Sequence, residues 1–284
     1  MSKTKLACFC LALLLGLAVP EQAWAWGPGV HLYLGDCLLA NLHLLPALPA
    51  QVISENRFSF LYGALSADML VGKGRELTPD HCHSWHAGFR LLDTAGEKRL
   101  QAYAMGYLSH LAADVIAHNY YVPNMLQLQR RRGKVRHVSI EMKADRHVGT
   151  SFQDIRRIVQ GSIKDADAQL LKILRTSKMT FSVKKMIFKG GVRLAGWNQL
   201  ERQGIGLSRS QVTHKEYLQH MLDLSQQVIA DCLNHTRDAE VASFDPMGFQ
   251  NLGLVKKRSG KGVAHPRKRE MAVFFVPAMC LLSL

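Results

Sequence analysis

The chain has 284 residues and carries 36 Lys and Arg against 22 Asp and Glu, a formal net charge of +14. Its hydrophobic fraction of 48% supplies enough apolar residues to bury a core, which excludes a chain that is disordered throughout, and its 22 Gly and 9 Pro follow no period, which excludes a collagen-like chain. The basic excess favours an anionic partner such as a phosphate group, a nucleic acid or a lipid surface.

The first 25 residues have the pattern of a secretory signal peptide. Lys3 and Lys5 precede the apolar run Leu6–Val19, and Ala23-Trp24-Ala25 supplies the small residues of a cleavage site. An uncleaved membrane anchor is the alternative, although the run is short for a bilayer crossing. Cleavage would make Trp26 the first residue of an exported protein, periplasmic or extracellular, in which the four remaining cysteines could pair in three ways.

Residues 26–250 have the pattern of one multi-helix, all-α domain. Apolar residues recur at helical spacing in five stretches, and no alternating run bounded by turn residues predicts a strand. The predicted helical stretches are Val30–His43, Phe58–Leu70, Phe89–Val122 with an interruption at Gly96, Phe152–Ser177 and Lys215–His235.

Residues 251–284 differ from the rest and are predicted as a basic linker and an apolar tail. Basic residues are dense from Lys256 to Arg269, and Met271–Leu284 is almost wholly apolar, with Pro277 near its centre. The tail is too short to span a membrane. It either docks on the domain behind a disordered linker or anchors the protein on an anionic membrane surface.

The most informative stretch is the helical segment that begins at His110. His110, Asp114 and His118 follow one another at four-residue spacing, so they share one face of a helix whose other residues are apolar. Buried polar groups need partners, and imidazole nitrogen and carboxylate oxygen are zinc ligands. Zinc binding is therefore favoured over three core residues that are satisfied by hydrogen bonds.

Further candidate ligands lie on both sides of this helix. Downstream, His137 and Glu141 repeat the four-residue spacing, although a surface His near a Glu is common. Upstream, Asp68 ends a run of small residues, and His81 and His83 flank a cysteine in a cluster that could also be a loop with incidental metal affinity.

The predicted mature start adds Trp26 and His31. The sequence gives no packing reason for a tryptophan at this position. A free terminal amine and the carbonyl of the same residue can, however, chelate a metal in a five-membered ring.

Taken in order, these residues resemble the bacterial zinc-dependent phospholipase C family, which includes the clostridial alpha-toxin type. That family combines an N-terminal Trp, a His, an Asp, a second His, a helix with H-x-x-x-D and a later His, and an H-x-x-x-E pair. His83 is preferred to His81, because a zinc-binding His followed by x-Trp occurs in the toxin branch. The resemblance implies metal ligands at Trp26, His31, Asp68, His83, His110, Asp114, His118, His137 and Glu141.

The resemblance also implies three zinc ions and a phosphodiesterase that hydrolyses the glycerol–phosphate ester of phospholipids by attack of an activated water. Asp68 is then a general base as well as a ligand. The implied ligand sets are Asp68, His83, His110 and Asp114 for one ion, His118, His137 and Glu141 for another, and Trp26 and His31 for a third, with Asp114 bridging.

Two departures keep alternatives open. Three residues separate Asp114 from His118 where the family commonly has five, which means either a more regular helix or an altered second site. No lipid-binding β-domain of the toxin kind is visible. A single-strand-specific zinc nuclease is the closest alternative, because such nucleases share the spacing of Trp26 and His31, although their final pair is H-x-x-x-D and here it ends in Glu141. A non-catalytic zinc-binding, membrane-docking protein is the other.

Overall fold

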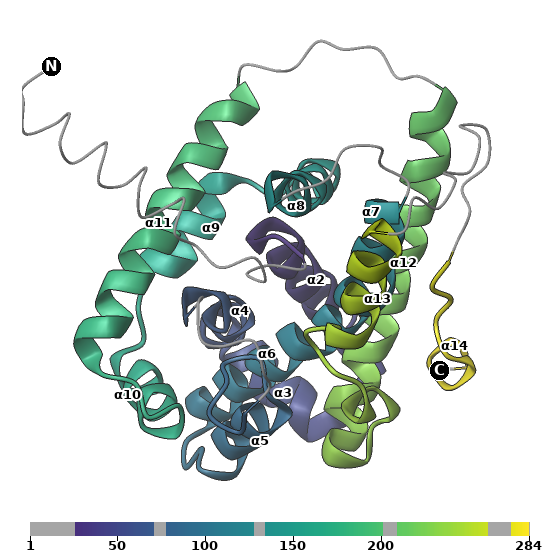
Figure 1. Cartoon of the computed structure of the whole chain (residues 1–284). Coiled ribbons are helices and arrows are strands. Elements are labelled where there is room, and N and C mark those ends of the chain that lie inside the picture. Colours follow the sequence, from purple (N-terminus) through teal and green to yellow (C-terminus); the bar gives the residue numbers. More distant parts are fainter. Residues whose placement is uncertain (1–25, 71–77, 128–133, 201–208, 261–273, 284) are drawn as a thin grey trace, which may run out of the picture.

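The computed structural model describes residues 26–70, 78–127, 134–200, 209–260 and 274–283. These residues form helices and connecting turns without a strand, which confirms the predicted all-α class (Figure 1). The predicted export signal, residues 1–25, lies outside the described residues.

The α-helices are α2 (Pro28–Ala40), α3 (Ala47–Glu55), α4 (Arg57–Ser66), α5 (Trp85–Asp93), α6 (Lys98–Ile116), α7 (Val122–Gln127), α8 (Lys134–Val148), α9 (Phe152–Gln160), α10 (Lys164–Ile173), α11 (Lys178–Leu200), α12 (Arg209–His235), α13 (Phe249–Gly260) and α14 (Met279–Leu282). Short 3-10 turns are η1 (Leu42–Leu44), η2 (Asp68–Leu70), η4 (Thr236–Asp238) and η5 (Glu240–Ser243), and η3 (Ala117–Tyr121) is a π-helical segment.

Helix α6 lies at the centre of the fold, and α4, α5 and α12 pack against it (Figure 1). Its residues from Gly106 to Ile116 are all buried. The crossing with α4 is very close, because a side chain on Gly63 would collide with the backbone carbonyl of Tyr103 and one on Gly106 with that of Phe60. Two glycines therefore let the backbones of α4 and α6 touch.

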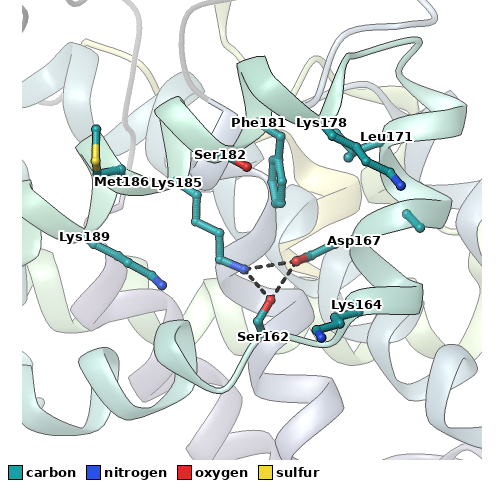
Figure 2. A pocket seen from close by; sticks show the side chains of 11 residues that line it. Ser162, Lys164, Asp167, Leu171, Lys178, Phe181, Ser182, Lys185, Met186 and Lys189 are labelled. Carbon is teal, nitrogen blue, oxygen red and sulfur yellow. Dashed lines mark hydrogen bonds and ion pairs between the residues drawn. The ribbon is translucent and has the colours of Figure 1, made fainter.

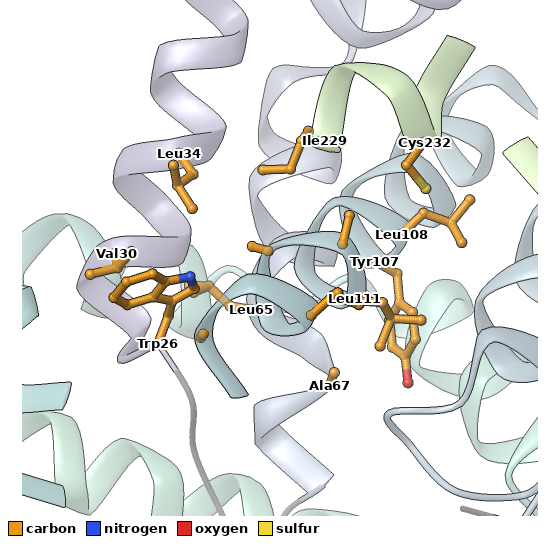
Figure 3. Close-up of a cluster of buried hydrophobic side chains, with 14 of the residues drawn as sticks. Trp26, Val30, Leu34, Leu65, Ala67, Tyr107, Leu108, Leu111, Ile229 and Cys232 are labelled. Atoms are coloured by element: carbon orange, nitrogen blue, oxygen red, sulfur yellow. The ribbon is translucent and has the colours of Figure 1, made fainter. Parts of the chain in front are cut away.

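The hydrophobic core is continuous where α2, α4, α6 and α12 meet (Figure 3). Trp26 is fully buried there, near Val30 and Leu65, and its ring stacks on Tyr121 with 4.7 Å between ring centroids. Burial of a tryptophan side chain is among the largest single apolar contributions to a core. Position 26 therefore has the packing reason that the sequence did not reveal.

Two helical predictions need correction. The stretch Phe152–Ser177 was predicted as one helix but forms α9 and α10. Helix α9 ends at Gln160, and its C-cap residue Gly161 lies so close to the Phe58 ring that a side chain would not fit there. Residues 251–260, predicted as linker, continue α13, because Val255 is buried against the domain.

Helix α11 was not predicted at all. Its buried positions, among them Phe181 and Phe188, alternate with exposed Met179, Val183 and Met186 on the opposite side. Apolar residues on both sides hide the one-sided pattern that identifies a surface helix. None of the described helices has both the length and the apolar character that a membrane crossing requires.

The C-terminal tail packs on the domain, as the first of the two interpretations expects. Phe275 and Leu281 are buried. The buried Asn124 side chain holds the tail backbone: its Nδ2 donates to the Phe275 carbonyl at 2.8 Å, and its Oδ1 accepts from the amides of Phe274 and Phe275 at 2.8 and 3.0 Å. The predicted disordered linker, from residue 261 to 273, lies outside the described residues.

We expect Asn124→Ala to release this tail. The substitution removes three hydrogen bonds to tail backbone groups, each worth about 1 kcal/mol and more where a buried partner is left unsatisfied. Limited proteolysis should then cleave the chain after Phe274 or Phe275 at least about tenfold faster, whereas Asn251→Ala, which removes a bond to the backbone of η3, should not change this rate. Equal rates in the two variants would contradict the role given to Asn124.

Candidate metal centre

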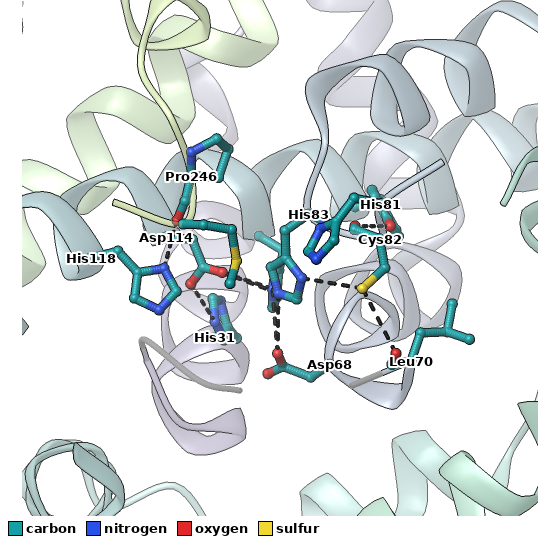
Figure 4. A network of polar contacts seen from close by, with 12 residues as sticks. His31, Asp68, Leu70, His81, Cys82, His83, Asp114, His118 and Pro246 are labelled. Atoms are coloured by element: carbon teal, nitrogen blue, oxygen red, sulfur yellow. Dashed lines mark hydrogen bonds and ion pairs between the residues drawn. The ribbon is translucent and has the colours of Figure 1, made fainter. Parts of the chain in front are cut away.

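Four buried side chains from three parts of the chain converge beside the crossing of α4 and α6, and Figure 4 labels three of them, Asp68, His83 and Asp114. Asp68 stands in η2, directly after α4, His83 precedes α5, and His110 and Asp114 lie one turn apart on α6. Each of the four residues is at most 3% exposed.

Five of the six distances between their ligand atoms are close to those of a tetrahedral zinc site. His83 Nε2 lies 3.5 Å from Asp68 Oδ1, 3.4 Å from Asp114 Oδ2 and 3.2 Å from His110 Nε2. His110 Nε2 lies 3.7 Å from Asp68 Oδ1 and 3.2 Å from Asp114 Oδ2. Zinc bonds of about 2.0–2.1 Å at tetrahedral angles place ligand atoms about 3.3–3.4 Å apart. His83, His110 and Asp114 can therefore hold one ion together, and Asp68 turns an oxygen toward the same two imidazoles.

The other carboxylate oxygen of Asp114 faces a different imidazole. His31, on α2, places its Nε2 3.3 Å from Asp114 Oδ1, and its ring stacks on that of His110 with 3.8 Å between centroids. Asp68 Oδ2 is buried and has no hydrogen-bond partner among the described residues. Asp114 thus has the arrangement of a carboxylate shared between two ions.

Contacts behind the rings turn the ε nitrogens toward this centre. His110 Nδ1 lies 2.9 Å from the Ala64 carbonyl and His118 Nδ1 lies 2.6 Å from the Pro246 carbonyl. A carbonyl accepts from a protonated Nδ1, which leaves the Nε2 lone pair for a metal. Burial lowers the pKa of His31 and of His118, which favours the neutral, metal-binding form of both rings.

The electrostatics of the centre call for a cation. Burial acts to raise the pKa of the Asp114 carboxyl, but His110 and His31 hold it well below its usual range. Burial raises the pKa of Glu141 well above its usual value, and the negative charges of Asp68, Asp145 and Asp114 raise it further. Divalent ions would relieve this crowding of acids.

The structure describes the remaining predicted ligands to different extents. His118 and Glu141 are buried, in η3 and α8. His137 lies on α8, one turn before Glu141, but its side chain is outside the described part of the chain. Trp26 directly precedes Gly27, the N-cap residue of α2, and its backbone would carry the terminal amine after the predicted cleavage.

The two neighbouring histidines His81 and His83 take different positions. His83 points its ε nitrogen at Asp68 and Asp114, whereas His81 lies on the far side of His83 (Figure 4) and accepts the His83 backbone amide on Nδ1 at 3.0 Å. Cys82 Sγ lies 3.3 Å from His83 Nδ1. The cysteines of the described residues, Cys37, Cys82, Cys232 and Cys280, are free thiols.

The short spacing from Asp114 to His118 does not reflect a regular helix. Helix α6 ends at Ile116, and the chain widens into the π-helical segment η3, which contains His118. Asn119 Nδ2 donates to the Asp245 carbonyl at 2.8 Å, next to the contact of His118 with Pro246. Wide turns of this kind occur mostly at functional sites, where they redirect a side chain.

Asp145 is a buried acid of this region that the sequence interpretation missed. Its Oδ1 accepts the Val30 amide at 2.9 Å, at the start of α2, and burial raises its pKa to about 7. A side chain on Gly29 would come within 2.9 Å of the carboxyl carbon, and one on Gly27 would also collide with it. The signal was present, because Asp145 follows Glu141 by the same four residues that separate His110 from Asp114.

Comparison with known proteins gives one match. A family model described as zinc dependent phospholipase C matches residues 30–180, more than half of the chain. This range contains eight of the nine predicted ligands, all except Trp26. No curated protein and no solved structure matches the chain. Together with the all-α fold and the spacing of Asp68, His83, His110 and Asp114, the match shows that the chain belongs to the zinc-dependent phospholipase C family.

Proposed function

We propose that this protein is an exported phospholipase C that uses zinc to hydrolyse the ester between glycerol and phosphate in phospholipids. The observation that carries the proposal is that the buried carboxylates of Asp68 and Asp114 place oxygens 3.2–3.7 Å from the ε nitrogens of two histidines, His83 and His110, in a chain of this family. The proposal includes three zinc ions, with the nine predicted residues as their ligands.

The structure supports the proposed ligand sets to different degrees. The first set has five ligand-atom distances of 3.2–3.7 Å, and the bridging role of Asp114 fits its separate contacts with His110 and His31. The second set rests on the burial of His118 and Glu141 together with the motif that places His137. Zinc in these sets would lower the pKa of water and neutralise the phosphate oxygens of the substrate.

In this proposal the side chains of the protein orient the metal ligands and accept the proton of the attacking water. The carbonyls of Ala64 and Pro246 hold two imidazoles in orientation, so the ligands need little rearrangement during turnover. Asp68 turns one oxygen toward His83 and His110, and its Oδ2 has no protein partner among the described residues. That second oxygen is the proposed acceptor for the proton of the attacking water.

Metal removal tests this function directly. The exported protein is purified and its first residue, expected to be Trp26, is read by N-terminal sequencing. We expect about three zinc ions per chain and hydrolysis of short-chain phosphatidylcholine to diacylglycerol and phosphocholine. Chelation should lower the rate at least about a hundredfold, because the ions stabilise the transition state by several kcal/mol, and added zinc should restore it.

Two substrates separate the remaining alternatives. Cleavage of single-stranded DNA without hydrolysis of any phospholipid headgroup class would show the nuclease instead. Bound zinc without hydrolysis of either substrate would show a non-catalytic zinc protein. Phosphatidylglycerol and phosphatidylethanolamine are included with phosphatidylcholine, so that headgroup preference is not mistaken for inactivity.

A further inference from the structure

Helix α11 presents an apolar stripe to solvent. Met179, Val183 and Met186 are 78%, 44% and 64% exposed, and their spacing places them on one side of the helix. Phe181 and Phe188, on the opposite side, pack in the core. A helix that is already buried along one side ordinarily carries charged or polar residues on the other, so the exposed methionines need an explanation.

Lysines border this stripe. A groove of about 560 Å³ runs between α11 and α10, next to Met186, and Lys178 and Lys189 line it from α11 while Lys164 lines it from α10 (Figure 2). These three lysines make no ion pair with any residue that the structure describes. Ser182 adds a hydroxyl group at the same edge.

The acid in the groove is already neutralised. Asp167 Oδ2 lies 3.1 Å from Lys185 Nζ, which also donates to Ser162 Oγ at 2.8 Å and to the Tyr62 hydroxyl at 2.5 Å. Lys185 is buried and has three acceptors, so it belongs to the interior of the protein. The charge that remains at the groove is therefore positive and comes from the three lysines named above.

The same helix reaches the metal centre. Helix α11 packs against η2, the turn that carries Asp68, and Lys184 Nζ donates to the Leu70 carbonyl at 3.1 Å. The exposed apolar stripe of α11 and the turn that carries Asp68 are thus connected through one helix.

We infer that this side of α11 is the docking surface for an anionic phospholipid membrane, with Met179, Val183 and Met186 entering the boundary of the acyl chains and Lys164, Lys178 and Lys189 contacting lipid phosphates. Apolar side chains between lysines are the pattern of a helix that lies in the plane of a membrane surface, and cations attract the negative potential of anionic lipids. The inference rests on the proposed function, because a phospholipase must reach substrate that lies in a membrane. Its binding step can be measured without turnover.

The test measures binding to vesicles by flotation. Wild-type protein should bind vesicles of phosphatidylcholine with 30% phosphatidylglycerol and bind pure phosphatidylcholine vesicles at least about tenfold more weakly. Met179→Ser/Met186→Ser and Lys178→Gln/Lys189→Gln should each weaken binding to the anionic vesicles at least about tenfold. The matched control is Leu44→Ser/Leu48→Ser, which removes two leucines that are 49% and 67% exposed elsewhere, and it should bind as wild type does.

Three results would overturn the inference. Wild-type protein does not bind anionic vesicles, or the methionine variant binds as wild type does, or Val276→Ser/Met279→Ser in the tail abolishes binding while the α11 variants retain it. Competition by inorganic phosphate together with unchanged binding of the methionine variant would show a free-phosphate site instead. Melting temperatures equal to that of wild type verify that each variant is folded.

The proposed function is judged separately. Wild-type hydrolysis of short-chain phosphatidylcholine below its micelle concentration needs no surface, so failure there removes the activity while leaving the binding result intact. If the wild-type protein hydrolyses that soluble lipid but does not bind anionic vesicles, only the docking inference is refuted.

Discussion

Asp114→Asn should lower the rate of phosphodiester hydrolysis at least about a thousandfold and reduce the zinc content of the protein. Asp114 contacts His83 and His110 through one oxygen and His31 through the other. The amide carries no negative charge and offers only one oxygen, so both proposed sites that share Asp114 would weaken. A loss of about 4 kcal/mol of transition-state stabilisation corresponds to this factor.

The control for this variant is Asp231→Asn on α12. Asp231 is also buried and pairs with a histidine four residues away, its Oδ1 lying 2.8 Å from His235 Nδ1, but it lies outside the metal centre. In Asp231→Asn, the zinc content measured by elemental analysis and the rate of hydrolysis of short-chain phosphatidylcholine should equal those of the wild type. Full zinc content and a normal rate in Asp114→Asn would refute the bridging role.

Lys185→Met should destabilise the protein by about 3 kcal/mol. The substitution leaves Asp167 buried without its cation, and breaking a buried pair from one side typically costs about 3–5 kcal/mol. The remaining bonds of Asp167 to Tyr62 and Ser162 place the expected value at the lower end. For a chain of this size the melting temperature should fall by about 6–12 °C.

Two further variants identify the cause of this loss. Lys178→Met makes the same change at an exposed position of α11 and should alter the free energy of unfolding by less than about 0.5 kcal/mol. Lys185→Met/Asp167→Leu removes both charges and should recover most of the stability, since replacing a whole buried pair by apolar residues is often neutral. Equal unfolding free energies for Lys185→Met and Lys178→Met would show that the pair contributes nothing.

The apolar stripe explains why α11 was harder to predict than the helices of the first half of the domain. Helices α2, α4 and α6 were predicted because apolar residues recur along them at helical spacing, and this signal is local. Helix α11 has methionines on its exposed side, so its sequence carries no one-sided pattern. The same property that hid α11 from the sequence interpretation marks it as a docking surface.

The amino-acid sequence by itself determined the all-α class, the order of the candidate ligands and the shared face of His110, Asp114 and His118, because helical periodicity relates residues four apart. Only the tertiary structure decided that His83 and not His81 faces Asp68, and that Asp145 meets the start of α2. These contacts join residues up to 115 positions apart. They depend on how closely the helices cross. The crossing of α4 and α6 is close because Gly63 and Gly106 have no side chains, and the effect of this exists only in the packed protein.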